Sequence, residues 1–176
     1  MIVIDWFDTA PRRIFAAVAV TCVLLLAFGV YLQQVVGLEP CPMCIVQRYA
    51  LILVAIVAAL TAFAKGRGGW IAGAVLTLLF SGFGAFVAAR QSWIQWYPPE
   101  SASCGRDFYG MIETFPLKRA IPMIFKGGGD CTKVDWTFLG GSIANWSFLW
   151  FCFMALVAIV MIARQLRPRV SGLAAA

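Results

Sequence analysis

Four apolar segments, each long enough to cross a bilayer as a helix, constrain this chain more than any other feature of its sequence. They cover about residues 14–33, 45–64, 70–89 and 146–163, and a membrane-spanning helix needs roughly 20 apolar residues. Within the hydrocarbon core every backbone N–H and C=O must be hydrogen-bonded inside the protein, so such segments fold as helices. The sequence therefore predicts an all-α membrane protein, a bundle of four transmembrane helices in a single domain over residues 1–176.

The composition fits a lipid bilayer as the main surroundings. Of the 176 residues, 62% are apolar and 12% are charged, whereas charged residues make up about a quarter of ordinary soluble domains. The 14 Lys and Arg residues are spread among apolar stretches and form no continuous basic face, so no nucleic-acid partner is expected. The first apolar run is longer than the hydrophobic region of a signal peptide, roughly 7–15 residues, and we interpret it as an uncleaved span.

Positive charges on short loops predict the orientation, because such charges resist translocation across the membrane. Basic residues lie in three places that fall on the same side of the membrane if each segment crosses it once: Arg12 and Arg13 before the first segment, Lys65 and Arg67 between the second and third, and Arg164, Arg167 and Arg169 after the fourth. We therefore expect residues 1–13, 65–69 and 164–176, and both termini, to be cytoplasmic. Residues 34–44 and 90–145 then form the two outer loops.

The six cysteines divide by their position relative to the spans. Cys22 and Cys152 lie deep in apolar segments, where a free cysteine behaves as a small hydrophobic residue. The other four fall in the outer loops or at their edge, in a compartment where disulfides form and persist: Cys41, Cys44, Cys104 and Cys131. These four are the candidate catalytic residues.

Cys41-Pro42-Met43-Cys44 is a C-x-x-C motif at the expected start of the second helix, and Pro42 suits a first helical turn. The partial positive charge of a helix N-terminus favours thiolate over thiol, which suits a pair that is oxidised and reduced in turn. A zinc site with four thiolates is an alternative. However, 26 residues separate Cys104 from Cys131, far more than in the usual zinc-binding pairs, and we expect no metal.

Arg48 follows Cys44 by four positions and therefore lies on the same helix face, one turn deeper in the membrane. An arginine within a span is costly and indicates a functional site, although a side chain that only reaches the headgroups is the alternative. A thiolate, a guanidinium and adjacent lipid together suit a lipophilic two-electron acceptor whose oxygens become negative on reduction. A quinone fits that description, so Arg48 is the candidate cofactor-binding residue.

The long outer loop carries two further features. Phe115–Lys126 mixes apolar and basic residues and predicts a short interfacial helix lying on the membrane, with a packed loop as the alternative. Gly127–Gly129 follows directly before Cys131 and predicts a flexible joint that lets Cys131 move between partners, or an ordinary surface turn.

Taken together, these motifs resemble the DsbB family, and the match covers nearly the whole chain. It rests on their order along the sequence: Cys41-Pro42-Met43-Cys44 with Arg48, the basic turn at 65–69, Gln95-Trp96-Tyr97-Pro98, Cys104, Gly129-Asp130-Cys131, and Trp136-Thr137-Phe138-Leu139-Gly140. The resemblance implies a thiol:quinone oxidoreductase of the bacterial inner membrane, with the outer loops in the periplasm. Its partners would be a DsbA-like thioredoxin-fold oxidase and ubiquinone or menaquinone, the system that keeps the periplasm oxidising.

The resemblance also implies a role for each cysteine. Cys104–Cys131 would be the disulfide that oxidises DsbA, with Cys104 forming the mixed disulfide. Cys131 would then attack Cys41, and Cys44 would pass both electrons to the quinone beside Arg48. Some members carry a histidine near the start of the long periplasmic loop, whereas this chain has none and Gln91 stands in that region.

Other classes of protein remain open at this point. A vitamin K epoxide reductase-like enzyme also joins a helical bundle to quinone chemistry, but its C-x-x-C motif follows a later span. A scaffold held by two structural disulfides explains the cysteines but leaves Arg48 and the helix-start C-x-x-C without a reason. Reduction of a quinone by an added dithiol would separate the enzymes from the scaffold.

Overall fold

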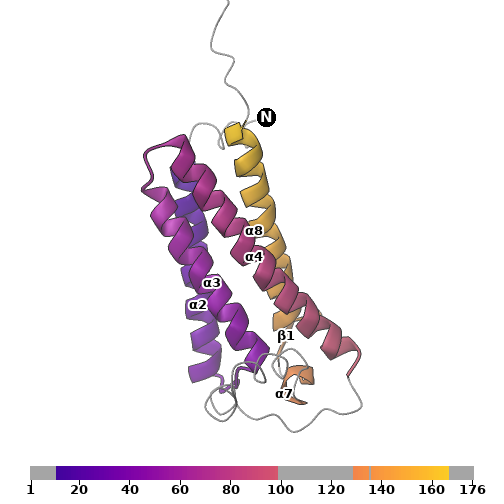
Figure 1. Ribbon diagram of the computed structural model, residues 1–176. Coiled ribbons are helices and arrows are strands. Elements are labelled where there is room, and N and C mark those ends of the chain that lie inside the picture. The colour runs from indigo at the N-terminus through magenta and orange to yellow at the C-terminus, as the bar shows by residue number, and fades with distance from the viewer. Residues whose placement is uncertain (1–10, 99–128, 135, 167–176) are drawn as a thin grey trace, which may run out of the picture.

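The computed structural model describes residues 11–98, 129–134 and 136–166. Its four long helices are α2 (Pro11–Gln34), α3 (Pro42–Ala62), α4 (Arg67–Trp96) and α8 (Ile143–Leu166), and each is long and apolar enough to cross a membrane. The predicted class, an all-α membrane protein built as a four-helix bundle, is confirmed (Figure 1). The interfacial helix expected at Phe115–Lys126 lies outside the described residues.

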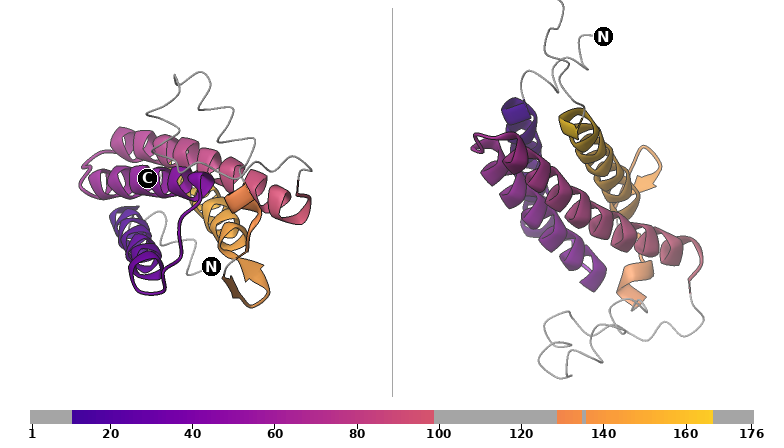
Figure 2. Two further views of the ribbon diagram at one scale, coloured as in Figure 1. Left: turned by 90° about the horizontal axis from the view of Figure 1, so that it is seen from below. Right: turned by 45° about the horizontal axis from the view of Figure 1, so that its top comes forward.

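The helices pack in chain order: α2 against α3, α3 against α4, and α4 against α8 (Figure 2). A packed core joins all four near the end where α2 begins, and it includes Phe15, Cys22, Val54, Ala74 and Met154. The opposite end carries the connection between α2 and α3, the short helix α7 (Gly129–Thr132) and a hairpin of β1 (Thr137–Phe138) and β2 (Gly141–Ser142). One end of the bundle thus holds the core that joins all four helices, and the other end holds Cys41, Cys44 and Cys131.

Of the basic residues expected on one face, those that the structure describes lie at the packed end of the bundle: Arg12, Arg13, Lys65, Arg67 and Arg164. Arg12 Nε donates to the backbone oxygen of Ala62 at 2.9 Å, and Arg67 Nε donates to the backbone oxygen of Gln165. The last carbonyls of a helix lack partners within that helix and carry partial negative charge, so these guanidinium groups stabilise the ends of α3 and α8.

Helix α4 is longer than the apolar segment at residues 70–89 that predicted it. It continues from the expected end near residue 89 to Trp96, because no helix breaker occurs before Pro98 and the residue before a proline disfavours the helical conformation. The added turns include the buried side chains of Gln91 and Ile94. The polar residue Gln91 therefore belongs to α4 and is buried there, although its position in the sequence suggested a loop.

Glycine permits the close approach of α4 to its neighbours. A Cβ atom on Gly73 would lie 2.0 Å from Thr61 Oγ1, and one on Gly84 would lie 2.4 Å from the ring of Phe151. Helices in membranes associate mainly by van der Waals packing, and small residues allow their backbones to approach. Gly84 thus fixes the distance between α4 and α8.

Replacing Gly84 with alanine should lower the free energy of unfolding by about 1–3 kcal/mol, because the new methyl group overlaps the Phe151 ring. Thermal unfolding in detergent, followed by helical circular dichroism, measures the change. Gly82→Ala is the matched control: nothing lies within 4 Å of its Cβ position, so the better helix propensity of alanine should leave stability equal or slightly higher. Equal destabilisation by the two substitutions would contradict this account of the α4–α8 contact.

Candidate active site

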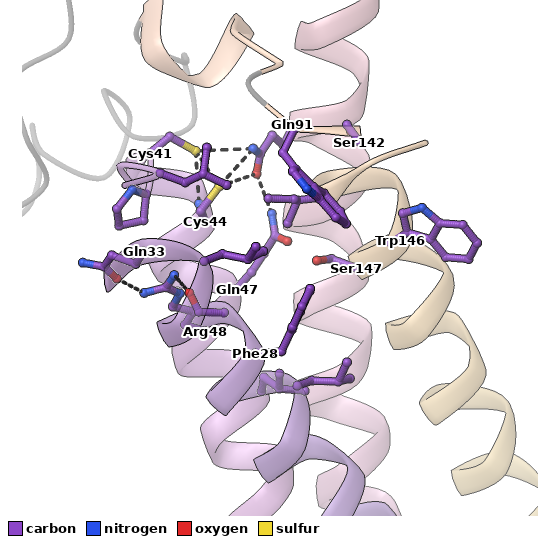
Figure 3. Close-up of a pocket in the computed structure, with 18 of the residues that line it drawn as sticks. Phe28, Gln33, Cys41, Cys44, Gln47, Arg48, Gln91, Ser142, Trp146 and Ser147 are labelled. Carbon is purple, nitrogen blue, oxygen red and sulfur yellow. Dashed lines mark hydrogen bonds between the residues drawn. The ribbon is translucent and has the colours of Figure 1, made fainter. Parts of the chain in front are cut away.

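The C-x-x-C motif forms the start of α3. Cys41 is the N-cap residue, its sulfur accepts a hydrogen bond from the Cys44 backbone N–H at 3.3 Å, and Pro42 occupies the first turn. The sulfurs of Cys41 and Cys44 are 2.8 Å apart (Figure 3). A disulfide bond measures about 2.05 Å, so a shift of under about 1 Å would join them. The local fold thus presents a thiol pair ready to close.

Helix α7 brings a third cysteine to this pair. Cys131 is fully buried and packs in one cluster with Cys41, Met43, Val87 and Ile94. Its thiol is also a hydrogen-bond partner of Cys41. Three of the four expected catalytic cysteines therefore lie together, although Cys131 follows Cys44 by 87 positions in the sequence. Cys104 lies outside the described residues.

Cys41 is the central sulfur of the three. Hydrogen bonding with Cys131, hydrogen bonding with Cys44 and burial together raise the pKa of the Cys41 thiol well above its ordinary value. Cys41 therefore holds its proton in the reduced state, and its S–H points a hydrogen bond at the sulfur of Cys44. A negative charge at this end of α3 is best carried by Cys44, which also receives the electrostatic influence of Arg48.

Two buried amides complete the surroundings of the pair. Gln91 Nε2, from α4, donates to Cys41 Sγ at 3.3 Å and to Cys44 Sγ at 3.2 Å. Gln47 Nε2, one turn after Cys44 on α3, donates to Gln91 Oε1 at 2.6 Å. Only 3% of Gln91 and 6% of Gln47 is exposed, so these contacts are made away from solvent.

Arg48 joins α3 to α2 just below the cysteine pair. Its Nη1 donates to Gln33 Oε1 at 2.5 Å, and its Nη2 donates to the backbone oxygen of Gly29 at 3.0 Å. The side chain is half-buried and lines the same cavity as Cys44. These hydrogen bonds hold the guanidinium among the helices, in contrast to an arginine that only reaches the headgroups.

A cavity of about 510 Å³ opens beside Cys44 between α2, α3, α4 and α8. Its lining is mostly apolar, with Arg48, Gln47 and Gln91 among the polar groups. Four aromatic side chains form one wall, which we call the aromatic wall: Phe28, Trp136, Phe138 and Trp146. An apolar cavity with a few polar groups at one end is typical of a site for a small lipophilic ligand.

The hairpin holds the aromatic wall in place. Leu139 and Gly140 have φ angles of 50° and 79°, which a tight two-residue hairpin turn requires, and the indole N–H of Trp146 donates to the backbone oxygen of Phe138 at 2.9 Å. The Trp136 ring meets Phe28 edge-on at 6.2 Å between centroids and stacks on Phe138 at 6.1 Å. The first helix and the hairpin thereby share one aromatic surface.

The structure brings Cys41, Cys44, Cys131 and Arg48 to one end of the bundle, and it adds residues that the motifs did not identify. Gln91 donates to the cysteine sulfurs, Gln33 accepts from Arg48, and Gln47 donates to Gln91. A signal for Gln47 was present in the sequence: it lies in an otherwise apolar span three positions after Cys44, where a polar side chain needs a hydrogen-bonding partner. Of the other two cysteines, Cys22 is buried in the core and Cys152 is exposed on α8.

Known proteins with similar sequences identify the family. The family model described as "Disulfide bond formation protein DsbB" matches residues 11–161. Among curated proteins named "Disulfide bond formation protein B", one from a Polaromonas species is 73% identical, and the match covers 94% of this chain and 99% of that protein. One from Paracidovorax citrulli is 66% identical over 98% of both chains, and one from Aromatoleum aromaticum is 51% identical over 90% of this chain and 96% of its own. This chain is therefore a multi-pass membrane protein that belongs to the DsbB family of disulfide bond formation proteins.

Proposed function

We propose that this protein reoxidises a periplasmic DsbA-like thioredoxin-fold oxidase and passes the electrons to a membrane quinone, ubiquinone or menaquinone. It would thereby sustain disulfide formation in exported proteins. One observation carries the proposal: Cys131, Cys41, Cys44 and the cavity follow one another in space, so each group contacts the next. This order is what electron transfer from a protein thiol to a lipophilic acceptor requires.

The thiol steps exchange disulfide bonds without net loss of electrons. A thiolate of the reduced partner attacks Cys104 of the Cys104–Cys131 disulfide, and the partner's second thiol displaces Cys104 as the partner's own disulfide forms. Cys131, now a thiolate, attacks Cys41 of the Cys41–Cys44 disulfide and releases Cys44 as a thiolate. Cys104 then attacks Cys131, which restores the first disulfide and leaves Cys41 and Cys44 reduced. The contact between Cys131 and Cys41 supports the third of these steps.

The cavity residues fit a quinone. A volume of about 510 Å³ lies within the roughly 300–1,000 Å³ of small-molecule sites, the aromatic wall suits a flat ring, and Arg48 supplies donors for an oxygen that becomes negative. When bound, a quinone accepts the two electrons and two protons that the partner dithiol loses overall. Cys44 would donate from the cavity side, Cys41 would re-form the disulfide with it, and Gln33 would hold Arg48 toward the cavity.

A purified-protein assay tests the proposed function. The full chain in detergent is mixed with a reduced DsbA-like protein and a soluble ubiquinone or menaquinone analogue, and quinone absorbance is followed. We expect catalytic loss of the quinone with one partner disulfide formed per quinone reduced. A scaffold with structural disulfides would leave both reactants unchanged, and stoichiometric bound zinc on the purified protein would contradict the redox role of the cysteines.

We propose the orientation that the basic residues indicate, with both termini cytoplasmic and the cysteine end periplasmic. The grouping of Arg12, Arg67 and Arg164 at the opposite end of the bundle supports it. After reduction of whole cells, a membrane-impermeant thiol reagent should label only cysteines of the set Cys41, Cys44, Cys104 and Cys131. A single-cysteine reporter placed after residue 166 should react only after the membrane is opened. Labelling of that reporter in intact cells would contradict the proposed orientation and place the C-terminus outside.

A further inference from the structure

Gln91 contacts both sulfurs of the Cys41–Cys44 pair, and the proposed function gives it no role. Its amide Nε2 lies 3.3 Å from Cys41 Sγ and 3.2 Å from Cys44 Sγ, so the NH₂ group donates to both members of the pair. Its Oε1 lies farther from Cys44 Sγ, at 3.6 Å. An amide nitrogen can only donate, and a sulfur accepts strongly only when it is a thiolate.

Gln47 determines which way the Gln91 amide faces. Its Nε2 donates to Gln91 Oε1 at 2.6 Å, which occupies the oxygen and leaves the nitrogen directed at the sulfurs. Both glutamines are more than nine-tenths buried, so water does not compete for these hydrogen bonds. The two amides form a chain that runs from α3 to α4 and back to the start of α3 (Figure 3).

We propose that Gln91 is a catalytic residue that stabilises the thiolate of Cys44 in the reduced pair, and that Gln47 is the positioning residue that directs its N–H. The inference rests on the proposed cycling of Cys41 and Cys44. In this chain, which contains no histidine, the uncharged amide of Gln91 would supply the hydrogen-bond donor to the Cys41–Cys44 pair. Among the described residues, the ionisable groups in contact with Gln91 are the thiols of Cys41 and Cys44, with Cys131 against Cys41 and Arg48 acting on Cys44.

The donor acts on one redox state more than on the other. In the disulfide both sulfurs are neutral and accept weakly, whereas the thiolate accepts strongly, so the N–H group stabilises the reduced pair selectively. A dithiol whose reduced form is stabilised is a stronger oxidant, because its disulfide is reduced more readily. Gln91 therefore makes Cys41–Cys44 a better electron acceptor for Cys131. The amide itself does not ionise near neutral pH, so the pH dependence of its contribution follows the ionisation of Cys44 alone.

The redox equilibrium of the pair tests this assignment. The full chain in detergent is equilibrated with mixtures of reduced and oxidised dithiothreitol, quenched with an alkylating reagent, and the peptide that carries Cys41 and Cys44 is quantified by mass spectrometry. Gln91→Leu should lower the equilibrium constant for reduction about tenfold, which corresponds to a potential lower by about 30 mV. Gln91→Glu should lower it further, because a carboxylate repels the thiolate. Gln91→His keeps an N–H donor and should restore most of the wild-type value.

Two further variants separate this role from packing. Gln47→Leu leaves Gln91 in place but frees its amide, so the equilibrium constant should fall by less than with Gln91→Leu. It also decides the question if Gln91→Leu fails to fold. Ser92→Ala is the matched control on α4: Ser92 is buried and its Oγ has no hydrogen-bond partner in the described part of the chain, so the constant should not change. Thermal unfolding of each variant monitors the fold.

Different results would overturn the role of Gln91 and the redox cycling of Cys41 and Cys44. Wild-type values for Gln91→Leu, Gln91→Glu and Gln47→Leu in a protein that still reduces quinone would overturn the role of Gln91 alone. Equal shifts for Gln91→Leu, Gln91→Glu and Gln91→His would show that the side chain acts only by packing. A wild-type Cys41–Cys44 pair that never changes redox state across the dithiothreitol series, with no quinone consumed, would overturn the proposed function.

Discussion

Replacing Cys44 with serine should stop quinone reduction, lowering its rate by about 10³-fold or more, because a hydroxyl neither carries the thiolate nor forms the Cys41–Cys44 bond. The structure adds a second expected result. Cys41 would be left beside Cys131, its hydrogen-bond partner, so its thiolate should attack Cys131 of the Cys104–Cys131 disulfide, release Cys104 as a thiolate and leave a Cys41–Cys131 disulfide. Mass spectrometry of the non-reduced, digested protein detects that linkage, and quinone absorbance gives the rate.

The control for this substitution is Cys152→Ala. Cys152 is exposed on α8 and belongs to neither the cysteine cluster nor the cavity lining, so quinone reduction should continue at the wild-type rate. Undiminished turnover by Cys44→Ser would remove Cys44 from the route to the quinone. In Cys44→Ser, a disulfide that joins Cys41 to a cysteine other than Cys131 would show that Cys131 approaches the pair differently in the working protein.

Arg48→Ala should reduce quinone turnover by about 10- to 100-fold while disulfide exchange between the DsbA-like partner and Cys104–Cys131 is retained. The variant loses the donors that face the cavity and the hydrogen bonds from Arg48 to Gln33 and Gly29. Arg48→Lys should restore part of the rate, because lysine keeps the charge but lacks the planar group that can bond two oxygens at once. Steady-state rates over a range of quinone concentrations, beside a stopped exchange assay without quinone, measure the two activities.

Gln33→Leu is the control for the hydrogen bond by which Arg48 joins α3 to α2. Gln33→Leu removes the partner of Arg48 Nη1 but keeps the guanidinium, so it should cost less quinone turnover than Arg48→Ala. Equal loss of quinone reduction and of partner exchange in Arg48→Ala would mean that the arginine supports the fold of the whole cysteine end. In that case its assignment to the quinone would fail.

The sequence predicted the four spans well because length and apolar content alone decide whether a helix can cross a bilayer. The ends of the spans were harder to place. Residues 90–96 are polar enough to resemble a loop, yet α4 continues through them, since buried contacts and the distance to Pro98 decide where it stops. Helix ends depend on neighbours that a single sequence does not display.

The cysteines were predicted as a set, but their arrangement follows from tertiary packing. Motif spacing indicated that Cys41 and Cys44 form a pair, whereas the contact of Cys131 with Cys41 depends on where α7 rests against α4. Gln91 was assigned to a loop and therefore given no contact with sulfur. The cavity could not be foreseen at all, because its sides come from the first and last helices of the bundle.

The walls of the cavity are synthesised at different times, because they come from both ends of the chain. The chain enters the membrane from its N-terminus, so α2, α3 and the thiol pair are in place well before α8. The wall that α8 and the hairpin contribute, with Trp146 and Phe138, is added only when the final span inserts. A growing chain therefore holds Cys41 and Cys44 before the cavity is complete, and the proposed electron transfer to a quinone would begin only after α8 has inserted.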